Sequence, residues 1–229
     1  MTRRAWLALA IALAVGGIAA FGVAERTGRP LPARAPEQRP TLVLLTSLPL
    51  MFGERFGLDG GGSPALVRLE QRYKVAPIGV ADAASLKGRT LLLMAHPRAQ
   101  PAEALVDLDH WVRRGGRVLL LADPRLDWPS ERPLGDLLRP PPMFADTGLL
   151  DHWGLGLVPP RPVSPGASGK LSSKGRSGCR IENAGKVARC RIERGQATVI
   201  ADADFINAAD PDAPGLDLLI AELARLESR

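Results

Sequence analysis

Short, continuous apolar runs recur along most of this chain and limit the folds that it can adopt. Each run is rich in aliphatic residues, and most lack the strict apolar and polar alternation of a half-buried strand. Continuous apolar strands are typical of parallel sheets, which are covered on both faces. The runs are TLVLLTS (41–47), KVAPIGV (74–80), TLLLMA (90–95), RVLLLAD (117–123) and ATVIADAD (197–204).

Amphipathic segments lie between these runs. In PAEALVDLDHWVRR (101–114), Leu105 and Leu108 fall on one helical face, and GLDLLIAELARL (215–226) shows the same spacing. Buried strands that alternate with amphipathic helices predict an α/β fold with a mostly parallel, doubly wound sheet. Hydrophobic residues make up 45% and charged residues 24%, as in ordinary folded proteins. We therefore expect residues 41–229 to form a single α/β domain.

The first 24 residues have the composition of a membrane-directing segment. Arg3 and Arg4 precede an uncharged run from Ala5 to Ala24, which is long enough to cross a hydrocarbon core of about 30 Å as a helix. The run exceeds the ~7–15 residues of a signal-peptide core, so we expect an uncleaved transmembrane helix; a cleaved signal segment is the alternative. Residues 25–40 contain four prolines and are expected to form an extended tether.

Two cysteines flank a predicted turn. In CRIENAGKVARC, Cys179 and Cys190 are equidistant from Ala184 and Gly185, so an inserted antiparallel β-hairpin places them opposite each other. Facing cysteines of a non-hydrogen-bonded pair are close enough for a disulfide. Because disulfides persist in oxidising compartments, we expect the main domain to lie outside the cytoplasm. The alternative is two small apolar strand residues that do not pair.

Polar residues follow the apolar runs at the edge where open α/β sheets place their ligand crevices. Ser47 follows the first run, His96 the third, Asp123 the fourth, and Asp202 and Asp204 the last. The carboxylates and the imidazole offer ligands for a divalent cation, and the last two aspartates have the spacing of a DxD motif. Aspartates at strand ends also cap the following turn by accepting hydrogen bonds from backbone N–H groups. We favour the capping interpretation.

Four stretches suggest a known family: TSLPLMFGE, DHWVRRGGRVLLLADP, LLDHWGL and GQATVIADADFIN. With these motifs the chain resembles, over most of residues 41–226, the extracytoplasmic glutamine-amidotransferase-like domain of auxiliary components of bacterial ABC transporters. These include the gliding-motility type and a related family of unknown function. The resemblance implies a flavodoxin-like, class I glutamine-amidotransferase-like fold and a membrane-tethered domain without enzymatic activity.

The catalytic residues of an amidotransferase are not expected here. Amidotransferases need a cysteine nucleophile on a strand-to-helix turn, and both cysteines of this chain lie in the predicted hairpin. A serine nucleophile would need a G-x-S-x-G elbow, and Ser47 lies in TSLPL, which lacks that pattern. We therefore expect no catalytic residue and no cofactor.

The excess positive charge of the chain is local. Residues 161–194 contain nine Lys or Arg and two Glu, whereas the net charge of the whole chain is +6. No aromatic residue is interleaved with these basic residues, so we do not expect nucleic acid to be a partner. We expect the region to contact anionic lipid or an acidic protein, or to remain a solvated charged face.

Two functions of different class follow from these features. The first is a non-catalytic accessory domain, anchored by residues 5–24 as a single-pass protein of the bacterial inner membrane, with its main domain in the periplasm. An ABC-transporter permease or ATPase is then the expected partner. The alternative is a metal-assisted hydrolase or transferase that uses His96, Asp123, Asp202 and Asp204.

Overall fold

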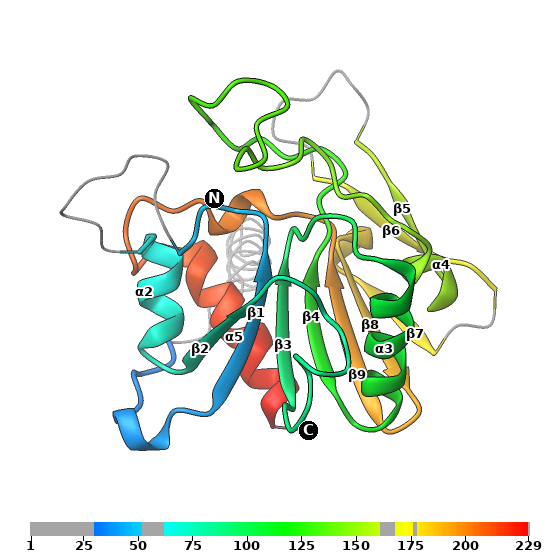
Figure 1. Ribbon diagram of the computed structural model, residues 1–229, viewed down its shortest axis with the longest axis horizontal. Helices are drawn as coiled ribbons and strands as arrows, with labels where there is room; N and C mark the ends of the chain where they lie inside the picture. The colour runs from blue at the N-terminus through cyan, green and yellow to red at the C-terminus, as the bar shows by residue number, and fades with distance from the viewer. Residues whose placement is uncertain (1–29, 52–61, 161–167, 176–177, 229) are drawn as a thin grey trace, which may run out of the picture. The chain divides into compact units, whose positions relative to one another are not determined.

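A seven-stranded, mostly parallel sheet organises the part of the chain that the computed structural model describes, residues 30–51, 62–160, 168–175 and 178–228 (Figure 1). Its strand order is β2-β1-β3-β4-β9-β8-β7. The parallel strands are β1 (Thr41–Thr46), β2 (Lys74–Ile78), β3 (Leu91–Ala95), β4 (Arg117–Leu121) and β9 (Gly195–Ile200). Their order within the sheet is 2-1-3-4-9. The prediction of an α/β fold with a mostly parallel sheet is confirmed.

The inserted hairpin adds two antiparallel strands to one side of this sheet. Strand β7 (Cys179–Glu182) pairs with β8 (Val187–Ile192), and β8 pairs with β9. The connecting turn, Asn183–Gly185, has three consecutive positive φ angles, which its Asn and Gly residues adopt readily. Cys179 lies directly opposite Cys190 with a Cα–Cα distance of 3.9 Å, and the two form a disulfide. The predicted hairpin and disulfide are both confirmed.

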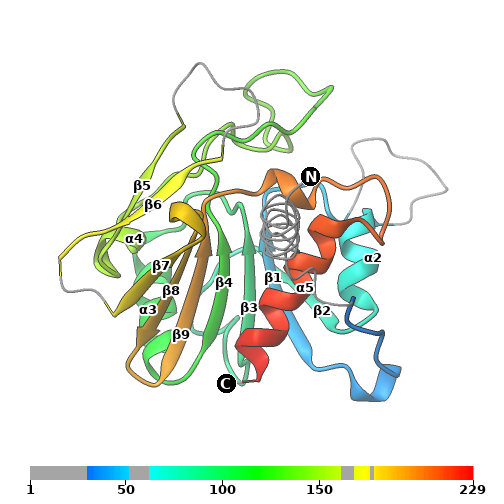
Figure 2. The same ribbon diagram turned by 180° about the vertical axis from the view of Figure 1, so that it is seen from behind.

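Helices lie on both faces of the sheet (Figures 1 and 2). Helix α3 (Ala102–Arg113) covers one face, and α5 (Pro214–Glu227) covers the other, where α2 (Pro64–Glu70) packs against it. Leu108 of α3 is buried, whereas Leu105 is only partly buried. On α5 the regularly spaced apolar residues are buried: Leu216, Leu219, Ile220 and Leu223. This arrangement explains the continuous apolar runs, because the central strands are covered from both sides.

The core on the α3 side also includes a segment that the sequence did not identify. The connection between β2 and β3 forms no helix, yet Ala81 and Leu86 from this loop are fully buried. They pack in one cluster with Val43 of β1 and Met94 of β3. A loop therefore takes the place of a crossover helix over this part of the sheet.

The junction between α3, β4 and β9 depends on glycine. Gly115 ends α3 with φ of +116°, a conformation that glycine adopts without strain. Gly195 begins β9 so close to α3 that a Cβ atom added there would lie 1.9 Å from the carbonyl oxygen of Val112. This close approach lets the helix rest directly against the start of β9.

A long excursion separates β4 from the hairpin. It contains an irregular loop (122–148), the short helix α4 (Leu149–His152), and a second, two-stranded antiparallel sheet of β5 (Leu155–Val158) and β6 (Lys170–Ser173). The second sheet was not predicted, because its short strands lie in a segment rich in Gly and Ser.

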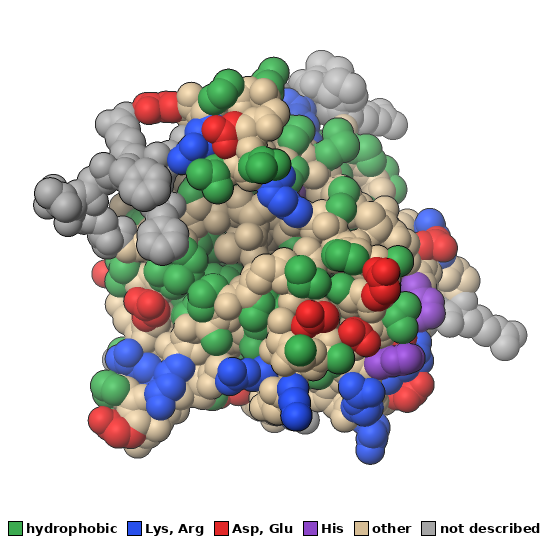
Figure 3. Space-filling view, in the orientation of Figure 1, with side chains coloured by type: hydrophobic (Ala, Val, Ile, Leu, Met, Phe, Trp, Pro, Cys, Tyr) green, Lys and Arg blue, Asp and Glu red, His purple; other side chains and the backbone are tan. Residues whose placement is uncertain are grey.

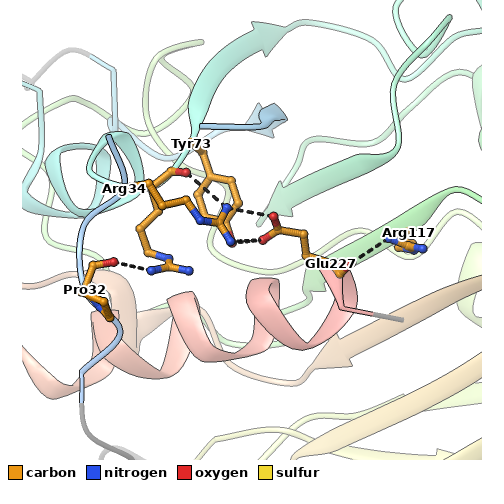
Figure 4. A network of polar contacts seen from close by, with 6 residues as sticks. Pro32, Arg34, Tyr73, Arg117 and Glu227 are labelled. Atoms are coloured by element: carbon orange, nitrogen blue, oxygen red, sulfur yellow. Dashed lines mark hydrogen bonds and ion pairs between the residues drawn. The ribbon is translucent and has the colours of Figure 1, made fainter. Parts of the chain in front are cut away.

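The described end of the expected tether packs on the domain. The compact unit begins at Pro32, and residues 36–38 form the 3-10 helix η1 (Pro36–Gln38). Arg34 donates two hydrogen bonds, of 2.8 and 3.0 Å, to the carboxylate of Glu227 at the end of α5 (Figure 4). Tyr73 donates to the same carboxylate at 3.2 Å, and its burial raises the pKa of its hydroxyl to about 12. Residues 32–40 are thus part of the folded unit.

No helix in the described ranges is long and apolar enough to cross a membrane. The predicted anchor, residues 1–24, lies outside these ranges, as do residues 25–29 of the predicted tether.

Candidate functional site

The carboxyl ends of the parallel strands bring the predicted site residues to one edge of the sheet. Asp123 lies two residues beyond β4, and Asp202 and Asp204 follow β9, its hydrogen-bonded neighbour. One carboxylate oxygen from each of the three aspartates lies within 4.8 Å of the others. The structure therefore brings these three aspartates together at one edge of the sheet.

Asp123 is the most buried of the three, with 3% of its surface exposed. Its Oδ1 accepts a hydrogen bond from the backbone N–H of Arg125 at 2.8 Å, and its Oδ2 accepts one from the N–H of Ala203, also at 2.8 Å. The backbone N–H of Phe144 donates to its carbonyl oxygen at 2.6 Å. One residue thus fixes the start of the long loop, a later part of the same loop and the turn after β9.

Asp202 and Asp204 organise the turn after β9 in a similar way. Asp202 Oδ1 accepts a hydrogen bond from the N–H of Asp204 at 2.9 Å, and its Oδ2 accepts one from the hydroxyl of Ser168 at 2.6 Å. Asp204 Oδ1 accepts from the N–H of Asp127 at 2.9 Å. Both side chains are half-buried. All three aspartates therefore cap loop segments, as the sequence interpretation expected.

Burial and the clustering of these carboxylates together raise the pKa of Asp204. Burial, followed by the negative charge of Asp123, raises the pKa of its carboxyl to about 6, and Asp202 acts in the same direction. The hydrogen bond from Asp127 opposes this shift only in part. An all-oxygen donor set of this kind can ligate a hard cation, and its oxygens also cap loop segments through hydrogen bonds.

His96 is not a member of the carboxylate cluster, although Asp123 is near enough to affect its titration. The residue is fully buried, has a positive φ of 47°, and contacts the carbonyl oxygen of Pro141 through Nε2 at 3.0 Å. A carbonyl oxygen only accepts, so Nε2 carries the hydrogen and Nδ1 is the unprotonated nitrogen of the neutral ring. Nδ1 is buried and has no hydrogen-bond partner among the described residues. Burial lowers the pKa of the imidazole, which favours this neutral form.

Ser47 connects the first and third strands at the same edge. Its hydroxyl donates to the backbone carbonyl of His96, while the neighbouring Thr46 hydroxyl donates to the carbonyl of Ala95 at 2.8 Å. Ser47 is therefore occupied in joining two loops and has no general base as its hydrogen-bond acceptor. The two cysteines cannot substitute for it, because both are joined in the disulfide.

Loop residues that no sequence pattern indicates complete this edge. Pro141 accepts the hydrogen bond of His96, and Phe144 donates to Asp123, although both lie in an irregular Pro-rich segment. No local pattern signals these contacts, since they depend on how the loop folds back over the strand ends. The sequence also gives no sign of the buried ion pair between Arg189 of β8 and Glu222 of α5, in which Nη2 lies 2.7 Å from Oε1.

These features define the chain as a mostly parallel α/β domain with a disulfide-linked hairpin and an acidic cluster at the carboxyl edge of its sheet. No protein-family model matches the chain, and no curated protein matches it. Among solved structures it is similar to the mmIFT52 N-terminal domain, with 13% identity, a TM-score of 0.53, and coverage of 81% of this chain and 96% of that one. At this identity, the similarity concerns the fold alone.

Large glycosidases also show similarity over one part of their length. A β-galactosidase from Bacillus circulans sp. alkalophilus has 13% identity and a TM-score of 0.45, with 86% of this chain and 32% of that chain covered. An exo-β-1,4-mannosidase from Opitutaceae bacterium strain TAV5 has 14% identity and a TM-score of 0.43, with 83% and 34% covered. The chain spans about a third of the length of these enzymes.

Proposed function

We propose that this chain is a non-catalytic accessory domain, anchored in the bacterial inner membrane and exposed outside the cytoplasm. In this proposal it serves an ABC transporter or another envelope complex, as its resemblance to the amidotransferase-like auxiliary domains implies. The observation that carries the non-catalytic part is the use of the strand-end carboxylates. Both oxygens of Asp123, both of Asp202 and one of Asp204 accept hydrogen bonds that hold loops in place.

The location outside the cytoplasm is supported by the disulfide. Cytosolic thiols are kept reduced, whereas disulfides persist in the periplasm and other oxidising compartments. The Cys179–Cys190 bond joins the two strands of the edge hairpin, and Cys190 is buried in the core on the α3 side. A structural disulfide in this position fits a domain that folds after export.

The loop over the acidic edge offers a surface for a protein partner. Leu134, Leu137 and Leu138 are 87%, 83% and 60% exposed, and Met143 in the same loop is 59% exposed. Figure 3 shows hydrophobic side chains among charged ones where this loop rises above the sheet. Exposed apolar side chains that cluster in one loop are typical of protein contact sites. We therefore assign the contact with the transporter permease to this loop.

Co-purification tests this function. The full-length chain, recovered from its own membranes after mild solubilisation, is expected to carry a membrane partner. The variant L134S/L137S/L138S is expected to lose it. The control V106S/L218S, which alters exposed apolar residues on α3 and α5, is expected to retain it. Failure of the unmodified chain to recover any membrane partner would contradict the proposal.

The alternative function, metal-assisted hydrolysis or group transfer, is favoured by the proximity of the three carboxylates, whose ligand atoms lie within 4.8 Å of one another. A thermal-shift titration with Mg²⁺, Mn²⁺ and Ca²⁺ separates the two functions. Stabilisation by a divalent cation that disappears in D204N would favour the alternative. A melting temperature that no divalent cation changes would count against the alternative and favour the accessory function.

A further inference from the structure

A basic groove lies on the outer part of the sheet, on the face that carries α5. Its volume is about 410 Å³, and it is lined by β7, β8, the beginning of β9 and the last turn of α5. Four arginines line it, together with a single acidic residue, Glu182. Figure 2 shows β7, β8 and β9 to one side of α5. The arginines are Arg180, Arg189, Arg191 and Arg225.

Strand alternation and the disulfide hold the arginines on this face. Cys179 and Cys190 face the core on the α3 side, so the next residue on each strand, Arg180 and Arg191, faces the opposite side. Arg189, which precedes Cys190, lies on this opposite side too, and it pairs with Glu222 of α5. The arginines therefore lie on the face of the sheet that carries α5. Because the disulfide joins the two strands at the residues before Arg180 and Arg191, both guanidinium groups project from a fixed part of the hairpin.

Ion pairing neutralises only one of the four arginines. Arg189 donates to Glu182 at 2.8 Å and to Glu222, and these contacts raise the pKa of its guanidinium. Arg180, Arg191 and Arg225 are exposed and have no ion pair within the described part of the chain. When Glu182 in the lining and Glu222, the partner of Arg189, are counted against the four arginines, the net charge at the groove is +2. Within the described ranges, no further ion pair balances this positive charge.

We infer that this groove binds a phosphate-bearing anion. Guanidinium groups form bidentate hydrogen bonds with phosphate oxygens, and here three unpaired guanidinium groups surround one concave volume. Gln196 and Thr198 add polar side chains to the groove wall. A volume of about 410 Å³ suits a small phosphate compound or a phospholipid headgroup better than a folded protein. None of the residues that line this groove belongs to the acidic edge or to the apolar loop.

Isothermal titration calorimetry on the full-length chain in neutral detergent tests this inference. The probes are pyrophosphate, as a soluble phosphate, and dihexanoyl phosphatidylglycerol, as a phospholipid headgroup, with dihexanoyl phosphatidylcholine as the zwitterionic comparison. We expect saturable binding of at least one of the two anionic probes. We expect R180Q/R191Q/R225Q to weaken it at least tenfold, and the single variants R180Q and R191Q to weaken it by a smaller factor.

A matched variant separates the groove from the general basicity of the chain. K170Q/K186Q/R194Q removes the same charge from exposed residues of the basic region that do not line the groove, and we expect it to change affinity less than twofold. Binding of pyrophosphate alone would identify a soluble phosphate ligand, and binding of the phosphatidylglycerol probe alone a lipid headgroup.

Three results would overturn the inference. They are the absence of saturable binding of either anionic probe, equal weakening in the control variant, and tighter binding of a polyglutamate peptide than of pyrophosphate. The last result would assign the groove to an acidic peptide. None of these results bears on the accessory function, which is tested by co-purification and by the apolar loop variant.

Discussion

Asp123 Oδ2 accepts a 2.8 Å hydrogen bond from the backbone N–H of Ala203, which ties the end of β4 to the turn after β9. Both groups are buried, so the N–H of Ala203 has no access to water as a substitute partner. This contact explains why the acidic residue lies at the edge of an apolar strand: it satisfies backbone donors that the sheet itself leaves unpaired.

Removal of this acceptor is expected to destabilise the fold. D123A leaves the N–H groups of Ala203 and Arg125 without their acceptor, and we expect the free energy of unfolding to fall by about 2–4 kcal/mol, because buried bonds to a charged group are lost. Urea denaturation measures the loss. D123N is the matched control, since its amide oxygen retains one acceptor, and it is expected to be intermediate. Unchanged stability of D123A would contradict the capping role.

Neutralisation of Asp204 is expected to stabilise the protein at neutral pH. Its pKa is raised from 3.8 to about 6 on folding, so between these values the folded form holds a proton that the unfolded form releases. The contribution of this group to stability therefore falls as pH rises through that window and stays low above it. In D204N the amide oxygen still accepts from Asp127. We expect the melting temperature of D204N to exceed that of the unmodified chain at pH 7.5 and to converge with it near pH 4. A lower melting temperature at pH 7.5 would disprove this.

The ion pair between Arg189 and Glu222 is expected to be sensitive to loss of one partner. The side chains are only 15% and 7% exposed, so R189M leaves Glu222 as a buried, unpaired carboxylate and should cost about 3–5 kcal/mol. The double variant R189M/E222L removes both charges and should recover most of that loss. A double-mutant cycle by urea denaturation measures the coupling. The single variant E222L completes the cycle, and additive effects of R189M and E222L would show that the pair is not coupled.

The disulfide is expected to stabilise the hairpin by restricting the unfolded chain. The two cysteines are 11 residues apart, and a loop of this size contributes about 2–3 kcal/mol. C179A/C190A should therefore unfold at a lower urea concentration than the oxidised protein, and reductant should have no further effect on it. An equal unfolding midpoint for the oxidised protein and the variant would contradict the predicted stabilisation.

Several features were predictable from the sequence because they depend on local patterns. Continuous apolar runs indicated strands buried on both faces, and the equal spacing of Cys179 and Cys190 about the turn indicated their register. The positions of Asp123, Asp202 and Asp204 just after strands indicated that they would meet, because the carboxyl ends of parallel strands share one edge.

The tertiary structure alone decided what these residues contact. The loop of residues 122–148 has no periodic pattern, so the sequence could not show that Pro141 would lie against His96. Nor could it show that Arg189, one of many arginines in a basic region, would reach Glu222, which is 33 residues away in the chain. Such contacts depend on the packing of distant elements. The apolar pattern by itself determined the sheet, and the folded loops and helices determined which polar groups are paired and which arginines have no ion pair among the described residues.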